Sequence, residues 1–199
     1  MLLNRENRVY LQYYAAIIDH ALLRLFWPNY GPINKLGHAF RSGQPSKMLL
    51  RRFKSQGGKT VISLRGGASK PHNVLERKYC KELGLRYINI PLSSTDAPQK
   101  STLLKLINTF KDLDTPFLLH CKTGADRTGL AAGIYLLSAE GFDHQIAKRQ
   151  LSWRYLHFGQ GRKRILRNFF NYYSTDHHEG QTLESWVHTN YIPENLDRI

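Results

Sequence analysis

The chain is organised around one stretch, which reads His120-Cys121-Lys122-Thr123-Gly124-Ala125-Asp126-Arg127-Thr128-Gly129. The apolar residues 117–119 directly before it, bounded by Pro116, are typical of a buried strand. The apolar residues 130–137 directly after it are typical of a buried helix. Because the backbone N–H groups of such a loop converge and the start of a helix adds positive potential, this stretch predicts an anion-binding site.

Two residues of the loop are suited to covalent chemistry on a bound anion. The positive potential lowers the pKa of Cys121, so that a nucleophilic thiolate can exist near neutral pH. Arg127 can fold back and bind two oxygens of a tetrahedral anion at once. The alternative is an inert core cysteine beside a surface arginine, but an inert cysteine needs no cationic surroundings. The loop also lacks the G-x4-G-K-[ST] pattern of a nucleotide-binding Walker loop.

The composition fits one folded domain with a marked excess of positive charge. The 199 residues are enough for one hydrophobic core. They include 29 Lys and Arg against 15 Asp and Glu, a formal net charge of +14. Such a charge attracts nucleic acid, anionic membranes or phosphorylated substrates. The two cysteines, Cys80 and Cys121, exclude a disulfide framework and suit a reducing compartment such as the cytoplasm.

Strands and helices alternate along the chain up to Cys121. We expect strands at Gly37–Phe40, Thr60–Leu64 and Arg86–Pro91, and helices at 46–55, Asn73–Leu83 and Lys100–Leu113. Ser46 is the expected N-cap of the first helix, which Gly57 and Gly58 end. This alternation predicts an α/β fold with a mainly parallel sheet and helices on both faces. The pattern beyond the loop is wholly helical, at Asp143–Trp153, Gly161–Tyr173 and Thr182–Tyr191.

The pattern His-Cys-x5-Arg-Thr-Gly resembles the active-site loop of cysteine-dependent protein tyrosine and dual-specificity phosphatases. The resemblance covers roughly residues 35–173, and 40–45 and 61–65 bring it nearest to the atypical dual-specificity phosphatases of bacteria, plants and fungi. It implies a central, mainly parallel sheet of four to five strands flanked by helices. We therefore divide the chain into an N-terminal helical extension (1–34), a phosphatase domain (35–174) and a helical tail packed on that domain (175–199).

The resemblance implies a role for each residue of the loop. Cys121 would attack phosphorus to form a phosphocysteine, which replaces one difficult displacement by two easier ones. Arg127 and the loop amides would hold the equatorial oxygens, and the Thr128 hydroxyl would stabilise the departing sulfur. The expected substrate-binding residues of the loop are Lys122, Thr123, Gly124, Ala125 and Asp126. His120 would orient the loop. Neither a metal nor a cofactor is expected, since arginine and amides supply the positive field.

The resemblance implies that the general acid lies on the loop before residues 100–113. Asp96 is the only acidic residue of that loop, although an aspartate before a proline commonly stabilises a turn. General acid catalysis contributes roughly 10²–10⁴ in rate, and Asp96 is the best placed candidate. Asp126, inside the loop, is the alternative. Arg65, at the end of a predicted strand, could extend the phosphate site or form a structural salt bridge.

The expected partner is a phosphorylated substrate, whose identity the sequence leaves open among phosphotyrosine, inositol phosphates, phospholipids and glycolipids. The segment Val9–Trp27 has apolar and aromatic residues at helical spacing, but charged residues interrupt it too often for a membrane-spanning helix. It could pack on the domain or lie in a membrane interface. We expect a cytoplasmic protein, with peripheral binding to the inner face of an anionic membrane as a hypothesis.

Other interpretations of the sequence compete with a phosphatase. A sulfurtransferase is disfavoured, because its loop usually holds fewer residues between the cysteine and the helix. A non-catalytic phosphate-binding module would not need an intact cysteine, arginine and aspartate. Binding to nucleic acid is unlikely, because the cations of residues 148–167 accompany no recognisable nucleic-acid motif. A metal site at residues 176–179 is disfavoured, because consecutive loop residues rarely hold one ion without further ligands.

Overall fold

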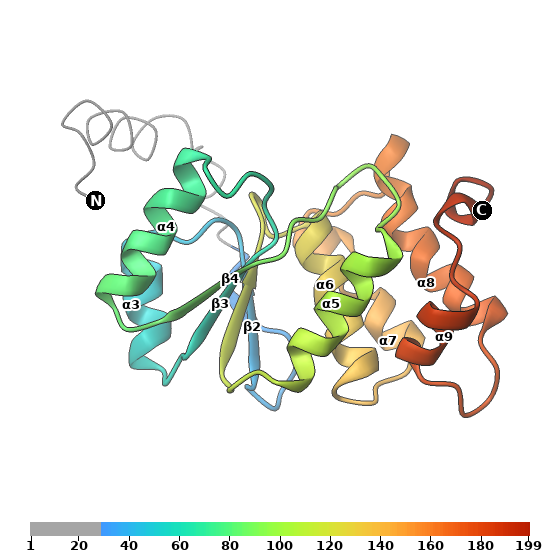
Figure 1. Ribbon diagram of the computed structural model, residues 1–199, viewed down its shortest axis with the longest axis horizontal. Coiled ribbons are helices and arrows are strands. Elements are labelled where there is room, and N and C mark those ends of the chain that lie inside the picture. Colours follow the sequence, from blue (N-terminus) through green and yellow to red (C-terminus); the bar gives the residue numbers. More distant parts are fainter. Residues whose placement is uncertain (1–28) are drawn as a thin grey trace.

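The computed structural model describes residues 29–199, in which a five-stranded sheet lies between two layers of helices (Figure 1). The strands are ordered β1 (Gly31–Pro32), β2 (Ala39–Ser42), β5 (Phe117–His120), β3 (Thr60–Ser63) and β4 (Arg86–Asn89). The last four are parallel to one another, and β1 pairs antiparallel with β2. The predicted α/β class and mainly parallel sheet are confirmed. The helix predicted at Val9–Trp27 lies outside the described residues.

Helices cover both faces of the sheet (Figure 1). One face carries α3 (Lys47–Ser55) and α4 (Pro71–Glu82). The other carries α5 (Lys100–Lys111) and α6 (Asp126–Ser138), and α7 (His144–Lys148), α8 (Ile165–Asp176) and α9 (Leu183–Thr189) lie outside these two helices. Two short 3-10 helices, η2 (Trp153–Tyr155) and η3 (Gly161–Arg164), lie between α7 and α8, and a third, η4 (Pro193–Asp197), follows α9.

Strands β3 and β5, in the middle of the sheet, are buried on both faces, and half or more of their residues are apolar. Alternate side chains of a strand point to opposite faces, so neighbouring residues enter different cores. Val61 and Leu118 pack with the residues of α3 and α4, whereas Ile62 and Leu119 pack with those of α5, α6 and α8. All four side chains are fully buried. The sheet is therefore packed on both faces, which fixes the strand ends from which the loop of Cys121 emerges.

Local sequence signals set the ends of α3 as expected. The Ser46 hydroxyl oxygen accepts a hydrogen bond from the Leu49 N–H at 3.2 Å and so caps the helix. Gly57 follows the helix with a φ of +85°, a conformation that favours glycine. Strand β2 begins two residues later than predicted, because Gly37 turns the chain with a φ of +72°.

The helix predicted at Asp143–Trp153 is wrong beyond Lys148, where α7 ends. Gln150 provides the physical reason. Its backbone and side-chain oxygens both accept hydrogen bonds from the Arg41 guanidinium, at 3.2 and 2.6 Å. The following residues form the separate η2 turn instead of a further helical turn. The helix predicted at Gly161–Tyr173 likewise begins as η3 and continues as α8 to Asp176.

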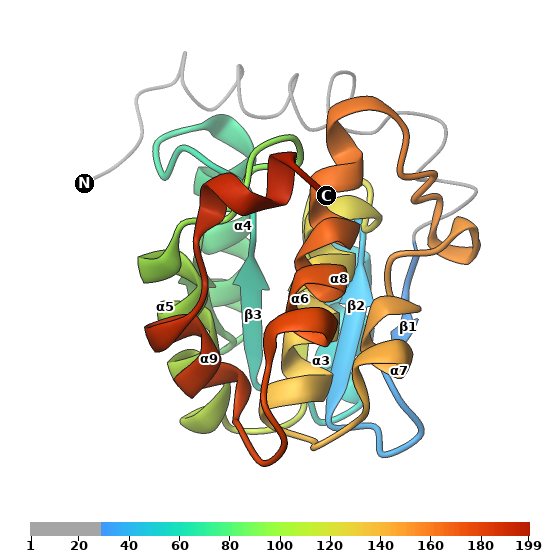
Figure 2. The ribbon, with the colours of Figure 1, turned by 90° about the vertical axis from the view of Figure 1, so that its right-hand side faces the viewer.

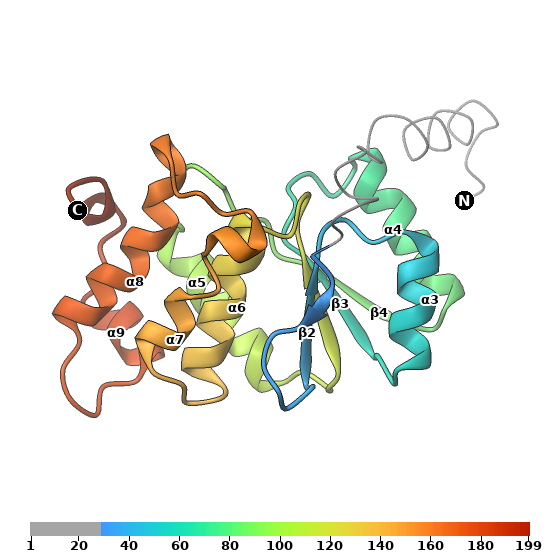
Figure 3. The ribbon, with the colours of Figure 1, turned by 180° about the vertical axis from the view of Figure 1, so that it is seen from behind.

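The C-terminal helices pack around one tryptophan. Trp186 of α9 is fully buried, and four aromatic rings have centroids 5.2 to 5.8 Å from its own: Phe169, Tyr172, Tyr173 and Tyr191. Its indole N–H donates to Asp176 at 2.8 Å. Figures 2 and 3 show α9 beside α5 and α8. Because α8 crosses the proposed boundary between residues 174 and 175, the division into domain and tail stays a prediction.

Among residues 29–199, no helix combines the length and the apolar character needed to cross a membrane.

Candidate active site

The loop after β5 is held from outside by its carbonyl oxygens. Each of three consecutive carbonyls accepts a hydrogen bond: Lys122 from the Gln44 N–H at 3.0 Å, Thr123 from Asn29 Nδ2 at 2.8 Å and Gly124 from Arg41 Nη2 at 2.7 Å. Outward carbonyls leave the N–H groups of the loop free to point inward. The loop is thus a set of converging donors, as an anion site requires.

Gly124 lets this loop lie directly against β2. Its φ is +77°, and a Cβ there would lie 2.6 Å from the carbonyl carbon of Ser42. No side chain fits so close to a backbone atom, so only glycine is compatible with this position. The exposed side chains of Lys122 and Thr123 flank the loop, whereas Ala125 is buried.

The Cys121 thiol is buried, with an exposed fraction of 1%, yet its pKa is lowered. Burial raises the pKa of the thiol, because it disfavours the charged thiolate. The positive charge of Arg127, the Thr128 hydroxyl and the N–H groups of Thr128 and Gly124 outweigh that effect. The four groups expected to stabilise a thiolate therefore gather around one sulfur.

Arg127 retains capacity to bind an anion. Its Nε is buried and has no hydrogen-bond partner among residues 29–199. A buried N–H donor without a partner costs free energy. We therefore expect a ligand bound beside the Cys121 sulfur to accept a hydrogen bond from this N–H group. An anion bound over Cys121 would fill this role.

A second arginine, Arg41, lies beneath the loop and is fully buried. Besides its bonds to Gln150 and Gly124, its guanidinium lies 3.5 Å above the centre of the Tyr155 ring. Burial lowers the pKa of Arg41 to about 10, against the opposing effects of Tyr155 and Cys121. Arg41 stays protonated at neutral pH and adds positive potential below the nucleophile. It belongs to the motif at residues 40–45, but the sequence assigned it no role.

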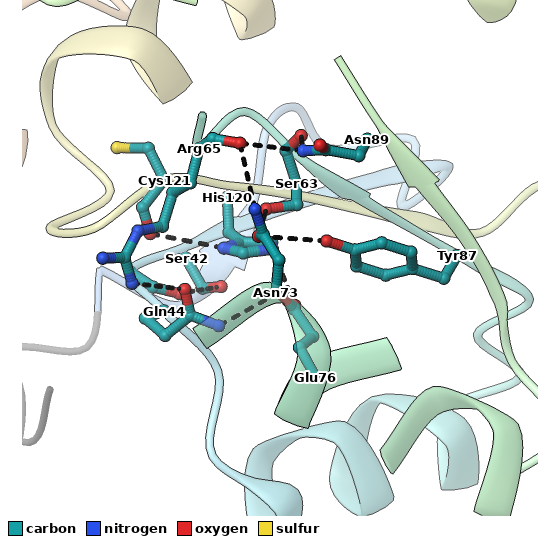
Figure 4. Close-up of polar contacts among 11 residues, drawn as sticks. Ser42, Gln44, Ser63, Arg65, Asn73, Glu76, Tyr87, Asn89, His120 and Cys121 are labelled. Carbon is teal, nitrogen blue, oxygen red and sulfur yellow. Dashed lines mark hydrogen bonds and ion pairs between the residues drawn. The ribbon is translucent and has the colours of Figure 1, made fainter. Parts of the chain in front are cut away.

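His120 is held by a carboxylate that the sequence did not reveal. Its Nε2 lies 2.7 Å from Oε1 of Glu76, a residue of α4, and both side chains are almost completely buried. Its Nδ1 lies 3.3 Å from the Cys121 carbonyl oxygen. The pair connects the strand before the nucleophile to α4 (Figure 4).

Hydrogen bonds through the Gln44 side chain connect the same carboxylate to Arg65. Glu76 Oε2 accepts from the Gln44 side-chain amide at 3.1 Å, and Gln44 Oε1 accepts from Arg65 Nη1 at 2.8 Å. The Asn89 and Asn73 side chains hold the Arg65 carbonyl oxygen at 2.8 and 3.4 Å. Figure 4 shows Arg65 extending beside Cys121 toward Gln44. The structure thus brings Arg65 to the catalytic loop, at the C-terminal edge of the parallel strands.

The two candidate acids lie in different surroundings. Asp96 is on the exposed loop between β4 and α5, where it accepts from Arg162 Nη2 at 2.7 Å and from Ser93 Oγ at 2.6 Å. Asp126 is buried, 2.8 Å from His157 Nδ1 and 3.1 Å from Lys163 Nζ. Burial raises the pKa of Asp126, but these two partners outweigh it and the pKa is lowered. Asp126 is therefore held as a carboxylate, which suits an anchor better than a proton donor.

Glu76, Gln44 and Arg41 are the site residues that sequence reasoning missed. Gln44 and Arg41 belong to a motif whose side chains have no predicted role, and Glu76 is one of two acidic residues in the helix predicted at Asn73–Leu83. Glu76 lies 44 residues before His120 in the sequence, and only the fold brings the two side chains into contact.

The fold is shared with known phosphatase structures. TpbA from P. aeruginosa, in complex with pTyr, is 22% identical with a TM-score of 0.51, over 62% of this chain and 72% of that one. The core catalytic domain of the PP-IP phosphatase SIW14 from S. cerevisiae is 20% identical with a TM-score of 0.58, over 75% and 88%. A DUF442 protein from Shewanella putrefaciens is 17% identical with a TM-score of 0.59, over 78% and 98%. Curated proteins gave no match.

A family model gives a more specific result. The model described as "DSP-PTPase phosphatase fused to NAD+ Kinase" matches residues 34–157, more than half of the chain. The match includes the loop of Cys121 and Arg127 and the elements that hold it. The chain therefore belongs to this family of DSP-PTPase phosphatases and is a phosphatase of the cysteine-dependent type.

Proposed function

We propose that the protein hydrolyses phosphomonoesters through a phosphocysteine on Cys121. The observation that carries this proposal is the geometry of the loop: three of its carbonyl oxygens are bonded outward, and the buried Nε of Arg127 has no partner among the described residues. The lowered pKa of the Cys121 thiol agrees with this geometry. Arg127 and the loop N–H groups stabilise the Cys121 thiolate, and the same groups attract a dianionic phosphate to it.

In the first step the Cys121 sulfur attacks phosphorus and the bond from phosphorus to the leaving oxygen breaks. Arg127 and the loop amides hold the three remaining oxygens as charge develops on them. Asp96, in its protonated form, donates a proton to the leaving oxygen. Because both of its oxygens accept hydrogen bonds in this structure, the Arg162 bridge has to open for that donation.

In the second step a water molecule attacks the phosphocysteine, and the bond from sulfur to phosphorus breaks. The Asp96 carboxylate accepts the proton of the attacking water, and inorganic phosphate leaves. The Thr128 hydroxyl stabilises the departing thiolate, in line with its effect on the pKa of Cys121. Arginine and amides supply the positive field, so we propose a reaction that needs no metal.

We propose Lys122 and Arg65 as further substrate contacts and residues 123–126 as the phosphate cradle. Lys122 is exposed beside the nucleophile, and the Gln44 side chain holds Arg65 at the same edge of the sheet. Asp126 contributes by anchoring the loop through His157. The catalytic unit would comprise residues 35–174, with 1–34 as an extension and 175–199 as a helical tail.

The proposed substrate is a phosphorylated lipid or glycolipid at an anionic membrane surface. The support is the net charge of +14, which draws the protein to anionic headgroups. The related structures point to two alternatives. TpbA was crystallised with pTyr, and SIW14 is described as a phosphatase of PP-IP. A phosphotyrosine or dual-specificity protein phosphatase is the main competing function.

The mechanism can be tested by trapping the intermediate. Rapid acid quench during turnover of an aryl phosphate should leave a phosphoryl adduct on Cys121, detectable by peptide mass spectrometry. Cys121→Ser should abolish both adduct and turnover, because a serine hydroxyl stays protonated in this loop. Cys80→Ala is the matched control, since Cys80 lies in the core on the opposite face of the sheet. Turnover by Cys121→Ser near that of the control would overturn the mechanism.

The substrate class needs a separate measurement. Phosphate release should be compared across phosphotyrosine peptides, inositol phosphates, phosphatidyl phosphates in mixed vesicles and phosphorylated glycolipids. The highest kcat/KM is expected for a lipid presented in vesicles. A phosphopeptide preference of tenfold or more would replace the lipid proposal and leave the cysteine mechanism standing.

A further inference from the structure

A cationic groove lined by two aromatic side chains lies between the end of α7, the segment that follows it and the first turn of α8. Its cavity of about 400 Å³ is lined in part by Lys148, Arg149, Trp153, Phe158 and Arg167. We call these five residues the Trp153 groove. The Trp153 and Phe158 side chains are 80% and 65% exposed, among the most exposed large apolar side chains of residues 29–199. Large aromatic rings at the surface mark an interaction site when they gather around one cavity.

The charge of this region is almost entirely positive. Between residues 143 and 167 the only acidic residue is Asp143, against seven basic ones: Lys148, Arg149, Arg154, Arg162, Lys163, Arg164 and Arg167. The three cations of the Trp153 groove form no ion pair within the described part of the chain. Uncompensated cations around a cavity favour an anionic ligand.

The groove lies on the segment that borders the catalytic loop. Asn29 Nδ2 donates to the carbonyl oxygens of both Thr123 and Tyr155, at 2.8 and 3.2 Å. Further along, His157 contacts Asp126 of the loop at 2.8 Å. Figure 2 shows this segment, in orange, at the end of the sheet toward which the β2 and β3 arrows point. A surface bound there would lie next to the site that contains Cys121.

We propose that the Trp153 groove docks the protein on an anionic membrane, with its cations on lipid phosphates and its two aromatic rings in the interface. Trp and Phe side chains prefer this depth, and basic residues near an anionic leaflet strengthen binding. The choice of a lipid surface over other polyanions rests on the proposed function. The proposal of a binding site at the groove rests on the cations, the exposed rings and the cavity. The five groove residues take no part in the proposed chemistry, while His157, which contacts Asp126, also lines the cavity.

The test is vesicle sedimentation of full-length protein carrying Cys121→Ser, so that the result does not depend on turnover. Binding to vesicles with about 30% anionic lipid should exceed binding to neutral vesicles. Because salt screens the attraction between charges, this binding should weaken as the salt concentration rises. Arg149→Gln with Arg167→Gln should weaken binding about thirtyfold, at about fivefold per cation near the surface. Trp153→Ala with Phe158→Ala should weaken it at low and high salt alike, because the apolar contribution is not screened.

The matched control is Arg51→Gln with Arg86→Gln, which removes the same charge from two exposed positions on α3 and β4. It should weaken binding less than about threefold. All variants, made also with Cys121 intact, should keep wild-type turnover of a soluble aryl phosphate, which confirms their fold.

Three outcomes would overturn the docking proposal. They are equal binding by the groove and control variants, no binding to anionic vesicles, and competition by soluble glycerol phosphate at millimolar concentration, which would mark a site for free anions. Tighter binding of single-stranded RNA, lost in the same groove variants, would assign the groove to nucleic acid instead. None of these outcomes affects phosphocysteine formation, so the two proposals fail separately.

Discussion

At the residue scale, the proposed reactivity of Cys121 depends on a balance between burial and a few hydrogen-bond donors. Burial raises the pKa of the thiol, and Arg127, Thr128 and the Gly124 N–H lower it further than burial raises it. The sequence could suggest the donors, because most of them lie within seven residues of the cysteine. It could not reveal Arg41, whose contribution depends on where β2 ends relative to the loop.

The Thr128 hydroxyl offers a direct test of this balance. Thr128→Val keeps the shape of the side chain and removes the hydroxyl, so the pKa of Cys121 should rise toward its ordinary value. Because less thiolate then exists at pH 6, alkylation by iodoacetamide should slow roughly tenfold at that pH. The acid limb of the kcat/KM profile should move to higher pH. Thr128→Ser keeps the hydroxyl and should behave as wild type, and an unchanged profile in both variants would exclude this role.

The general acid can be identified by comparing leaving groups. Asp96→Asn should reduce kcat for an alkyl phosphate by roughly 10²-fold and affect an activated aryl phosphate much less, because only a poor leaving group needs a proton. Asp126→Asn should affect both substrates alike, since it loosens the loop through His157. The reverse pattern would make Asp126 the acid.

At the element scale, the buried pair of His120 and Glu76 joins β5 to α4, and Gln44 extends the connection to the turn after β2. These contacts cross long stretches of sequence, so the spacing of residues gives no sign of them. The strand, loop and helix around Cys121 could be predicted because they are contiguous. The end of α7 could not, because the residue that interrupts it, Gln150, is held by Arg41, more than a hundred residues earlier.

Glu76→Gln tests whether this connection positions the loop. The variant keeps the size of the side chain and loses the charge that faces His120. A displaced loop should lower kcat about ten- to a hundredfold with a smaller effect on KM, since small misplacements of reacting groups are costly. Glu82→Gln is the control on the same helix, where the carboxylate is exposed and pairs with Lys47. If only the melting temperature changes and kcat does not, Glu76 is structural.

At the scale of the whole molecule, the excess of positive charge opposes folding. A formal charge of +14 in a compact chain is self-repulsive, and salt screens that repulsion. The melting temperature should therefore rise between 20 and 300 mM sodium chloride, by about 2–4 °C for each kcal/mol of repulsion relieved. Calorimetry measures this directly. A fall would mean that surface ion pairs, such as that of Lys47 and Glu82, outweigh the repulsion.

Comparing the melting temperature in sulfate with that in chloride at equal ionic strength separates charge screening from anion binding in the Cys121 loop. As a tetrahedral dianion it should raise the melting temperature beyond the effect of chloride, because a ligand of the native state stabilises it. Arg127→Ala should remove the additional rise and keep the part due to screening.

The placement of the two cysteines on opposite faces of the sheet determines how the enzyme responds to oxidants. Cys80 lies in the core beneath α3 and α4, while Cys121 belongs to the core on the other side. Peroxide would convert the Cys121 thiolate to a sulfenic acid, which a neighbouring thiol normally captures before further oxidation. Here the sheet separates the two sulfurs, so recovery depends on a thiol supplied from outside. Without one, inactivation should become permanent as the sulfinic acid accumulates.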